Sequence, residues 1–281
     1  MCLALLVGAG AMFKFISPFA KGIAIAGALI ATIAPLYWIF ILSTQDPAAS
    51  FGRPKFFYYP NFSSFSTVWS DRDFIAATRM SIVTGLLTVS IALLVTIPAA
   101  YILTKRQVRR KSGLLGWFFV AYLFPDFIIA LPLYSVLQNM GLYDTAIGLA
   151  LAYQGFMAPL SMWLFMAFFK TIPEELGQAA KIDGCSEWVT LRRIYLPLIR
   201  PGVATVAILV AINVWNEVTI SLALTSSNPT VPIVVSAYKG YAALRWDQLS
   251  AAILLSVIPV LIFSTLAQKQ IVKGLTEGVF N

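Results

Sequence analysis

The sequence predicts an all-α membrane protein that crosses the bilayer six times. Of the 281 residues, 59% are hydrophobic and only 11% are charged, whereas soluble domains carry about 25% charged residues. The mean hydropathy is +0.82. Six apolar stretches are each long enough to span a bilayer as a helix, which needs about 20 residues. These stretches are residues 22–43, 75–103, 114–136, 146–169, 202–223 and 248–270.

One six-span membrane domain, residues 22–270, is therefore expected between an N-terminal segment, 1–21, and a C-terminal tail, 271–281. Residues 2–13 are apolar but too few to span a bilayer. They also lack the basic start and the small-residue cleavage site of a signal peptide. We expect an interfacial helix here that leads into the first span.

The orientation follows from the basic residues, because loops rich in Lys and Arg stay on the cytoplasmic side. Loops 104–113 and 170–201 carry five each and the two tails carry four, which makes fourteen on one side. The other side has the remaining six of the 20. Loop 170–201 and both termini are therefore predicted to be cytoplasmic.

Several function classes are excluded by composition. The chain has no histidine, which removes histidine-based catalytic triads, proton relays and HExxH metal sites. Its two cysteines support neither a disulfide framework nor a metal site. The net charge of +8 lies beside apolar segments and indicates topology, not nucleic-acid binding. No catalytic residue and no metal site is predicted.

Loop 170–201 carries the clearest local signals for a folded structure. Thr171 is a candidate cap for a first helix, with Pro173 and Glu174 in the first turn. Gly184 is placed to end that helix in a left-handed conformation. Ser186 is predicted to start a second helix, which Pro197 and Pro201 close.

Ala179 and Ala180 leave one side of the first helix almost bare, so another helix could approach closely. The pattern alone also allows an amphipathic helix pair that lies on the membrane surface. In that alternative Trp188, Leu191 and Tyr195 would be the anchors.

This loop resembles the characteristic cytoplasmic loop of binding-protein-dependent ABC importer permeases. The family pattern is Glu-Ala-Ala, three residues, Gly, nine residues, Ile, one residue and Leu-Pro. The chain has Gln178, Ala179, Ala180, Gly184, Ile194, Leu196 and Pro197 at that spacing. It departs at Gln178, where the family usually has Glu, although Glu175 lies one turn earlier.

The resemblance extends from about Leu36 to Val279 and is closest to the carbohydrate-uptake, maltose-permease-like branch. "AAKIDGCSEW", which includes Asp183, "FPDFIIALPLY", "GLYDT", "VWNEV" and "QIVKGLTEGV" are all similar to that branch. It implies a type I ABC importer permease fold in a bacterial inner membrane. The first loop helix would then dock as a coupling helix on a cytoplasmic ATPase.

The same resemblance implies a heterodimer with a sister permease, two copies of the ABC ATPase and an extracytoplasmic solute-binding protein. The chain has no GxxxxGK[ST] phosphate loop. We therefore expect it to bind no cofactor, with ATP and Mg²⁺ on the partner ATPase. It would be a transport subunit, not an enzyme.

Polar residues inside membrane spans are candidates for a substrate pathway, because they are costly in lipid. The candidates are Asp126, Tyr134, Gln154, Asn213, Asn216 and Glu217. Each could instead tie helices together, and such hydrogen bonds contribute around 0.6 kcal/mol.

Two other functions remain open from the residues alone. A stand-alone secondary transporter would usually show inverted repeats and charged sites at the bilayer midplane, and neither is evident. An intramembrane enzyme would need a nucleophile motif, which is not evident either.

Overall fold

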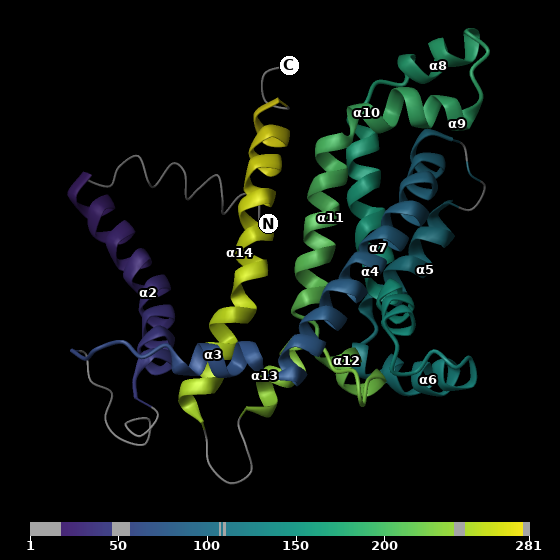
Figure 1. Cartoon of the computed structure of the whole chain (residues 1–281). Helices are drawn as coiled ribbons and strands as arrows, with labels where there is room; N and C mark the ends of the chain where they lie inside the picture. The colour runs from purple at the N-terminus through teal and green to yellow at the C-terminus, as the bar shows by residue number, and fades with distance from the viewer. Residues whose placement is uncertain (1–17, 47–56, 107, 109–110, 239–244, 278–281) are drawn as a thin grey trace. The chain divides into compact units, whose positions relative to one another are not determined.

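The computed structural model describes residues 18–46, 57–106, 108, 111–238 and 245–277. Every regular element in these ranges is helical (Figure 1), so the predicted all-α class is confirmed. Most of the predicted N-terminal segment 1–21 and the last residues of the predicted tail lie outside the described residues.

Four helices are long and apolar enough to cross a membrane. They are α2 (Pro18–Thr44), α4 (Arg72–Lys105), α7 (Ala146–Lys170) and α14 (Trp246–Glu277), and each matches a predicted span. Ile23, Ile30 and Ile33 of α2 are all more than half exposed. Such an apolar surface would be unfavourable in water and is suited to lipid.

The predicted third span is not one helix. The chain forms α5 (Lys111–Leu123) and α6 (Asp126–Asn139), with Pro125 as the N-cap of α6. Proline has no N–H to donate and disfavours a helical conformation in the residue before it. The break therefore follows from Pro125.

The predicted fifth span is also interrupted. Helix α11 (Arg200–Trp215) ends before the polar pair Asn216 and Glu217, and α12 (Thr219–Leu224) follows. Residues Glu187–Leu198 and Arg200–Trp215 together would make a fifth span, but they are bent by 79°. A total of six crossings stays a prediction.

The described chain divides into two compact units. The first contains α2, most of α3 (Ser63–Ser70) and the start of α14. There the Ser64 hydroxyl donates to Asp247 Oδ2 at 2.9 Å, and Arg245 pairs with the same buried carboxylate. This polar cluster joins α3 to the start of α14.

The second unit comprises residues 69–238 and 255–281. Its core lies between α4, α7 and α11, where Tyr153, Phe165, Phe169, Val206 and Val210 are fully buried. Helices α6, α12 and α13 (Val231–Ala237) lie at one end of this unit, and loop 170–201 lies at the other (Figure 1).

Candidate functional site

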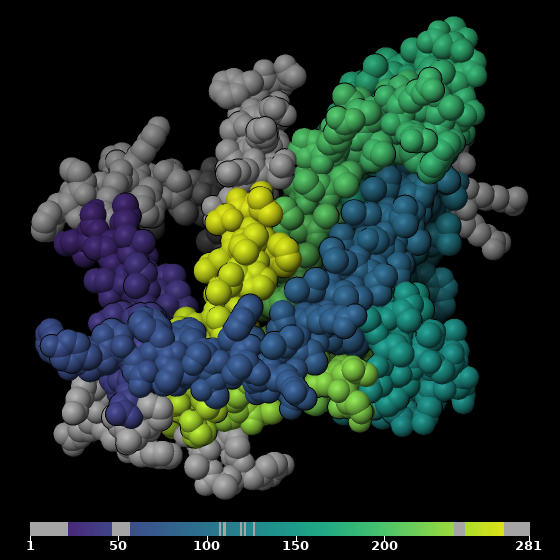
Figure 2. Space-filling view, viewed as in Figure 1, coloured from purple at the N-terminus to yellow at the C-terminus, as the bar shows by residue number. Residues whose placement is uncertain are grey.

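Loop 170–201 folds into two short helical arms. The first arm is α8 (Glu175–Ile182). The second arm consists of α9 (Glu187–Thr190), the wider π-helical turn η2 (Leu191–Tyr195) and α10 (Leu196–Leu198). The loop forms one end of the second unit, and its surface is continuous with that of α4 in the space-filling view (Figure 2).

The turn between the arms is built on Gly184, as predicted. Its φ is +72°, a conformation that residues with a Cβ rarely adopt. The Gly184 N–H donates to Lys181 O at 3.0 Å, and the Cys185 N–H donates to Ala180 O at 2.9 Å. These two bonds are those of a Schellman motif, which satisfies the last carbonyls of α8.

The start of the first arm differs from the prediction. Thr171 does not cap α8, because α8 begins only at Glu175; Thr171 is instead the C-cap of α7, and its hydroxyl donates to Phe168 O. Glu174 is the residue before α8 and makes no side-chain capping bond, and Pro173 lies before the helix. The prediction for Thr171 was wrong because this residue ends α7 and α8 starts too far along the chain for it to cap.

The second arm begins as predicted but does not end as predicted. The Ser186 hydroxyl accepts from the Val189 N–H at 3.4 Å, so Ser186 is the N-cap of α9. Pro197 does not stop the helix. The chain passes through it by widening the turn before it, where the Leu196 N–H donates to Leu191 O, and it bends only at Ile199.

The two alanines of the first arm face different surroundings. Ala179 is exposed, whereas Ala180 is 3% exposed and packs inside the chain. Gly177 also faces inward, because a Cβ there would lie 2.6 Å from Tyr195 Oη. The small residues of α8 therefore allow close packing on the second arm, and only Ala179 remains on the free surface.

The membrane-surface alternative fails for two of its three anchors. Leu191 and Tyr195 are 4% and 2% exposed and belong to the core. The Tyr195 ring packs against Tyr101 and Phe169, with centroids 5.1 and 6.1 Å away. Only Trp188, which is 63% exposed, points outward.

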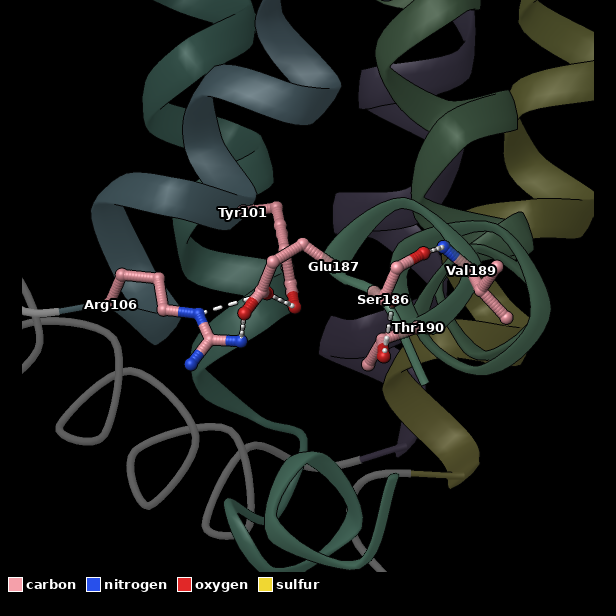
Figure 3. Close-up of polar contacts among 6 residues, drawn as sticks. All are labelled: Tyr101, Arg106, Ser186, Glu187, Val189 and Thr190. Carbon is pink, nitrogen blue, oxygen red and sulfur yellow. Dashed lines mark hydrogen bonds and ion pairs between the residues drawn. The ribbon is translucent and has the colours of Figure 1, made fainter. Parts of the chain in front are cut away.

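The second arm is held to the last turn of α4 through Glu187 (Figure 3). The Tyr101 hydroxyl and Arg106 Nε each donate to Glu187 Oε2 at 2.9 Å, and Arg106 Nη2 forms an ion pair with the other carboxylate oxygen. Lys105 Nζ donates to Ile172 O, just before α8. No sequence pattern predicts this arrangement, because Lys105 and Arg106 indicate only the topology.

Gln178 lies beside these contacts. A pocket between α4 and the loop is lined by Tyr101, Lys105, Arg106, Glu174, Gly177, Gln178, Lys181 and Tyr195. Of the other predicted loop residues, Glu175 and Asp183 are exposed, Ile194 lies in η2, and Leu196 and Pro197 lie in α10. The predicted loop residues thus occupy one folded object, with Leu196 packed against the core.

The predicted pathway residues lie on α6, on α7 and at the end of α11. Among the side chains that the structure describes, no hydrogen bond joins any two of them. Gln154 Nε2 donates to Thr88 O of α4 at 3.2 Å and ties α7 to α4. Tyr134 of α6 packs edge-on against Tyr143, with centroids 5.0 Å apart. Asp126 is the first residue of α6.

The three candidates near the end of α11 have separate local roles. Asn213 and Asn216 are exposed, and each donates to a carbonyl of its own helix at 2.8 Å. Glu217 accepts from the N–H groups of Ile220 and Ser221 at 2.7 and 3.0 Å. Those groups at the start of α12 have no helical partner of their own, so Glu217 stabilises the break. Contact with substrate stays a prediction for all six candidates.

At the opposite end of the unit, Asp144 holds a second loop. Its carboxylate accepts from the N–H groups of Ser226, Ser227 and Asn228 at 2.8–3.0 Å. Burial raises the pKa of Asp144, but hydrogen bonds from Ser226, Asn228 and Ser227 lower it more, so the pKa lies below its usual 3.8. We call this contact the Asp144 latch.

The Asp144 latch is expected to weaken only in acid. A carboxyl whose pKa is lowered by folding stabilises the folded state above its unfolded pKa, and the stabilisation is lost as the pH falls through the folded value. We expect Asp144→Asn to lower stability by about 1 kcal/mol at pH 7, since the carboxylate is partly solvated. Thermal midpoints measured from pH 7 to pH 3 check this. The difference between variant and wild type should shrink below about pH 4, and a constant difference would contradict it.

Comparisons with known proteins show which sequences and structures this chain resembles. Residues 92–277 match the model of a family described as "Binding-protein-dependent transport system inner membrane component". The chain is 31% identical to the trehalose transport system permease protein SugB of Mycobacterium tuberculosis, over 88% of this chain and 91% of that protein. It is also 31% identical to the trehalose/maltose transport system permease protein MalG of Thermococcus litoralis, over 90% and 94%.

A solved structure has the same fold. One chain of a bacterial ABC transporter that imports the acidic polysaccharide alginate superposes with a TM-score of 0.75. The two chains are 22% identical, and the match covers 91% of this chain and 98% of that one. The predicted type I importer permease fold is therefore confirmed.

Proposed function

Because the chain belongs to the family of binding-protein-dependent transport system inner membrane components, we propose that it is the permease subunit of an ABC importer for a sugar or a related polyhydroxylated solute. It forms half of the translocation pathway. The names of the relatives support the solute class, since both include trehalose. It is a transport subunit, and ATP with Mg²⁺ is bound by a partner.

The partners follow from the same proposal. A sister permease supplies the other half of the pathway, two copies of an ABC ATPase bind in the cytoplasm, and a solute-binding protein delivers the solute from outside. The chain lies in a bacterial inner membrane with both termini in the cytoplasm. The distribution of Lys and Arg supports this orientation.

The observation that carries the coupling role is the orientation of α8. Gly177 and Ala180 fix one side of this helix against the chain. Its other side presents Ala179 and Ile182, and Ile182 is 86% exposed. A short helix with a fixed inner side and a small apolar outer side suits a cleft on another protein, as in helix-in-groove recognition. We propose that this outer side docks on the ATPase.

The pathway is proposed to run along α11. Asn213 and Asn216 are exposed at its end, and amides on a lipid-facing surface would lose hydrogen bonding to water. We therefore propose that Asn213 and Asn216 face the sister subunit across a polar path. Their side-chain amides could bind sugar hydroxyls there.

Transport assays test the proposal as a whole. Membrane vesicles with the complete complex are expected to take up sugar only with ATP inside and the binding protein outside. Uptake by this chain alone, driven by an ion gradient, would instead support a secondary transporter.

Ala179→Trp tests the docking side of α8. The change is on the free surface, so the thermal stability of the chain should be unchanged while the ATPase no longer co-purifies. Ala237→Trp, a change at another exposed alanine at the end of α13, is the matched control and should keep the ATPase. Ala180→Trp should instead destabilise the loop by about 1–3 kcal/mol through overpacking. Normal co-purification with Ala179→Trp would contradict docking at this side.

A further inference from the structure

The last turn of α4 holds loop 170–201 at two points, one on each side of α8. Lys105 donates to the carbonyl of Ile172, which lies three residues before α8. Tyr101 and Arg106 bind Glu187, which lies five residues after it. The two contacts join residues 67 and 81–86 positions apart in the chain. We call Tyr101 and Lys105 of α4, together with its C-cap Arg106, the α4 clamp.

The α4 clamp differs from the covalent attachments of the loop. The loop continues from α7 and leads into α11, but the path into α11 bends by 79° and contains the wide turn η2. Such irregular turns can absorb movement. The clamp contacts instead connect the loop to a helix that is distant in sequence, and they lie on both sides of the docking helix.

The chemistry of the clamp allows one contact to open. Glu187 and Arg106 are 57% and 26% exposed as side chains, so water can replace their mutual contact at modest cost. Glu187 also lies in the first turn of α9, where the helix dipole favours a negative charge. The Lys105 ammonium lies 5.7 Å from the centre of the buried Tyr195 ring. The Lys105 contact is thus the more enclosed of the two.

We propose that Tyr101, Lys105, Arg106 and Glu187 are positioning residues that make α8 move with α4, so that docking of the ATPase is transmitted to this span. The inference rests on the proposed function and adds which membrane helix receives the motion. During this movement the exposed Arg106–Glu187 ion pair can open, whereas the hydrogen bond from Lys105 to Ile172 O stays in place.

The test uses the complete complex in proteoliposomes and measures sugar uptake per ATP hydrolysed. Arg106→Glu places two carboxylates together and should lower this ratio about five-fold, within the range found for residues that carry coupling. Hydrolysis without the binding protein should stay at the wild-type rate. Arg106→Glu combined with Glu187→Arg restores opposite charges and should recover most of the ratio. Lys111→Glu, the same charge change at the start of α5, is the control and should leave it unchanged.

The outcomes separate the two proposals. A wild-type complex that does not link uptake to ATP overturns the proposed function and this inference with it. A wild-type complex that does so while Arg106→Glu keeps the normal ratio overturns the clamp alone. Co-purification of the ATPase reports assembly, and if Arg106→Glu prevents assembly, the charge-swapped chain should restore it. A swap that restores neither assembly nor the ratio also overturns the clamp.

Discussion

Gly177→Ala is expected to lower coupled sugar uptake about ten-fold, and Tyr195→Phe in the same chain is expected to restore it. The new Cβ would lie 2.6 Å from Tyr195 Oη. The Tyr195 ring cannot move away, because it is 2% exposed and packed between Tyr101 and Phe169. Helix α8 must shift instead, at a cost of about 1–3 kcal/mol.

The double variant makes this prediction specific. Without the hydroxyl, the nearest ring atom is Cζ at 3.6 Å from the Cβ, an ordinary contact. Uptake and thermal midpoints of the wild type, both single variants and the double variant form a complete cycle. If Gly177→Ala is harmless, or if Tyr195→Phe does not rescue it, then α8 is not positioned by this contact.

Gly148→Ala is expected to destabilise the second unit by about 3 kcal/mol, near the upper end of overpacking costs. A Cβ at Gly148 would lie 2.1 Å from Leu142 O. This atom belongs to the backbone and already accepts the Thr145 hydroxyl at 2.6 Å. The whole turn before α7, including the Asp144 latch, would have to move.

Gly155 provides the matched control on the same helix. A Cβ there meets nothing within 4 Å, so Gly155→Ala should leave stability unchanged or raise it slightly, since Ala favours helix. Thermal unfolding and the yield of folded chain in detergent are the measurements. Equal effects of the two substitutions would contradict the close approach at Gly148.

Features that depend on neighbouring residues could be predicted from the sequence. The Gly184 turn and the Ser186 cap are closed by hydrogen bonds between residues three to five positions apart. The local pattern of residue types is therefore sufficient to predict them. Hydropathy likewise located α2, α4, α7 and α14. The spacing from Gln178 to Pro197 correctly indicated the family.

Where local signals competed, sequence reasoning was less successful. Thr171 has the right type to cap α8, but it ends α7, and α8 begins only at Glu175. Pro197 looked like a helix end, yet the chain accommodates it with a wider turn. Both outcomes depend on which of two available backbone arrangements packs better, and residue type does not decide that.

The sequence by itself determined the class of protein, four of the spans and the local design of the loop, because hydrophobicity, capping and turn preferences act over a few residues. Only the tertiary structure decided which side of α8 faces inward, because Ala179 and Ala180 are the same residue type and yet only Ala180 is buried. It also decided that α4 holds the loop, because Tyr101, Lys105 and Arg106 meet partners 67–86 residues away. Such meetings depend on how α4 and α7 pack, which no local pattern specifies.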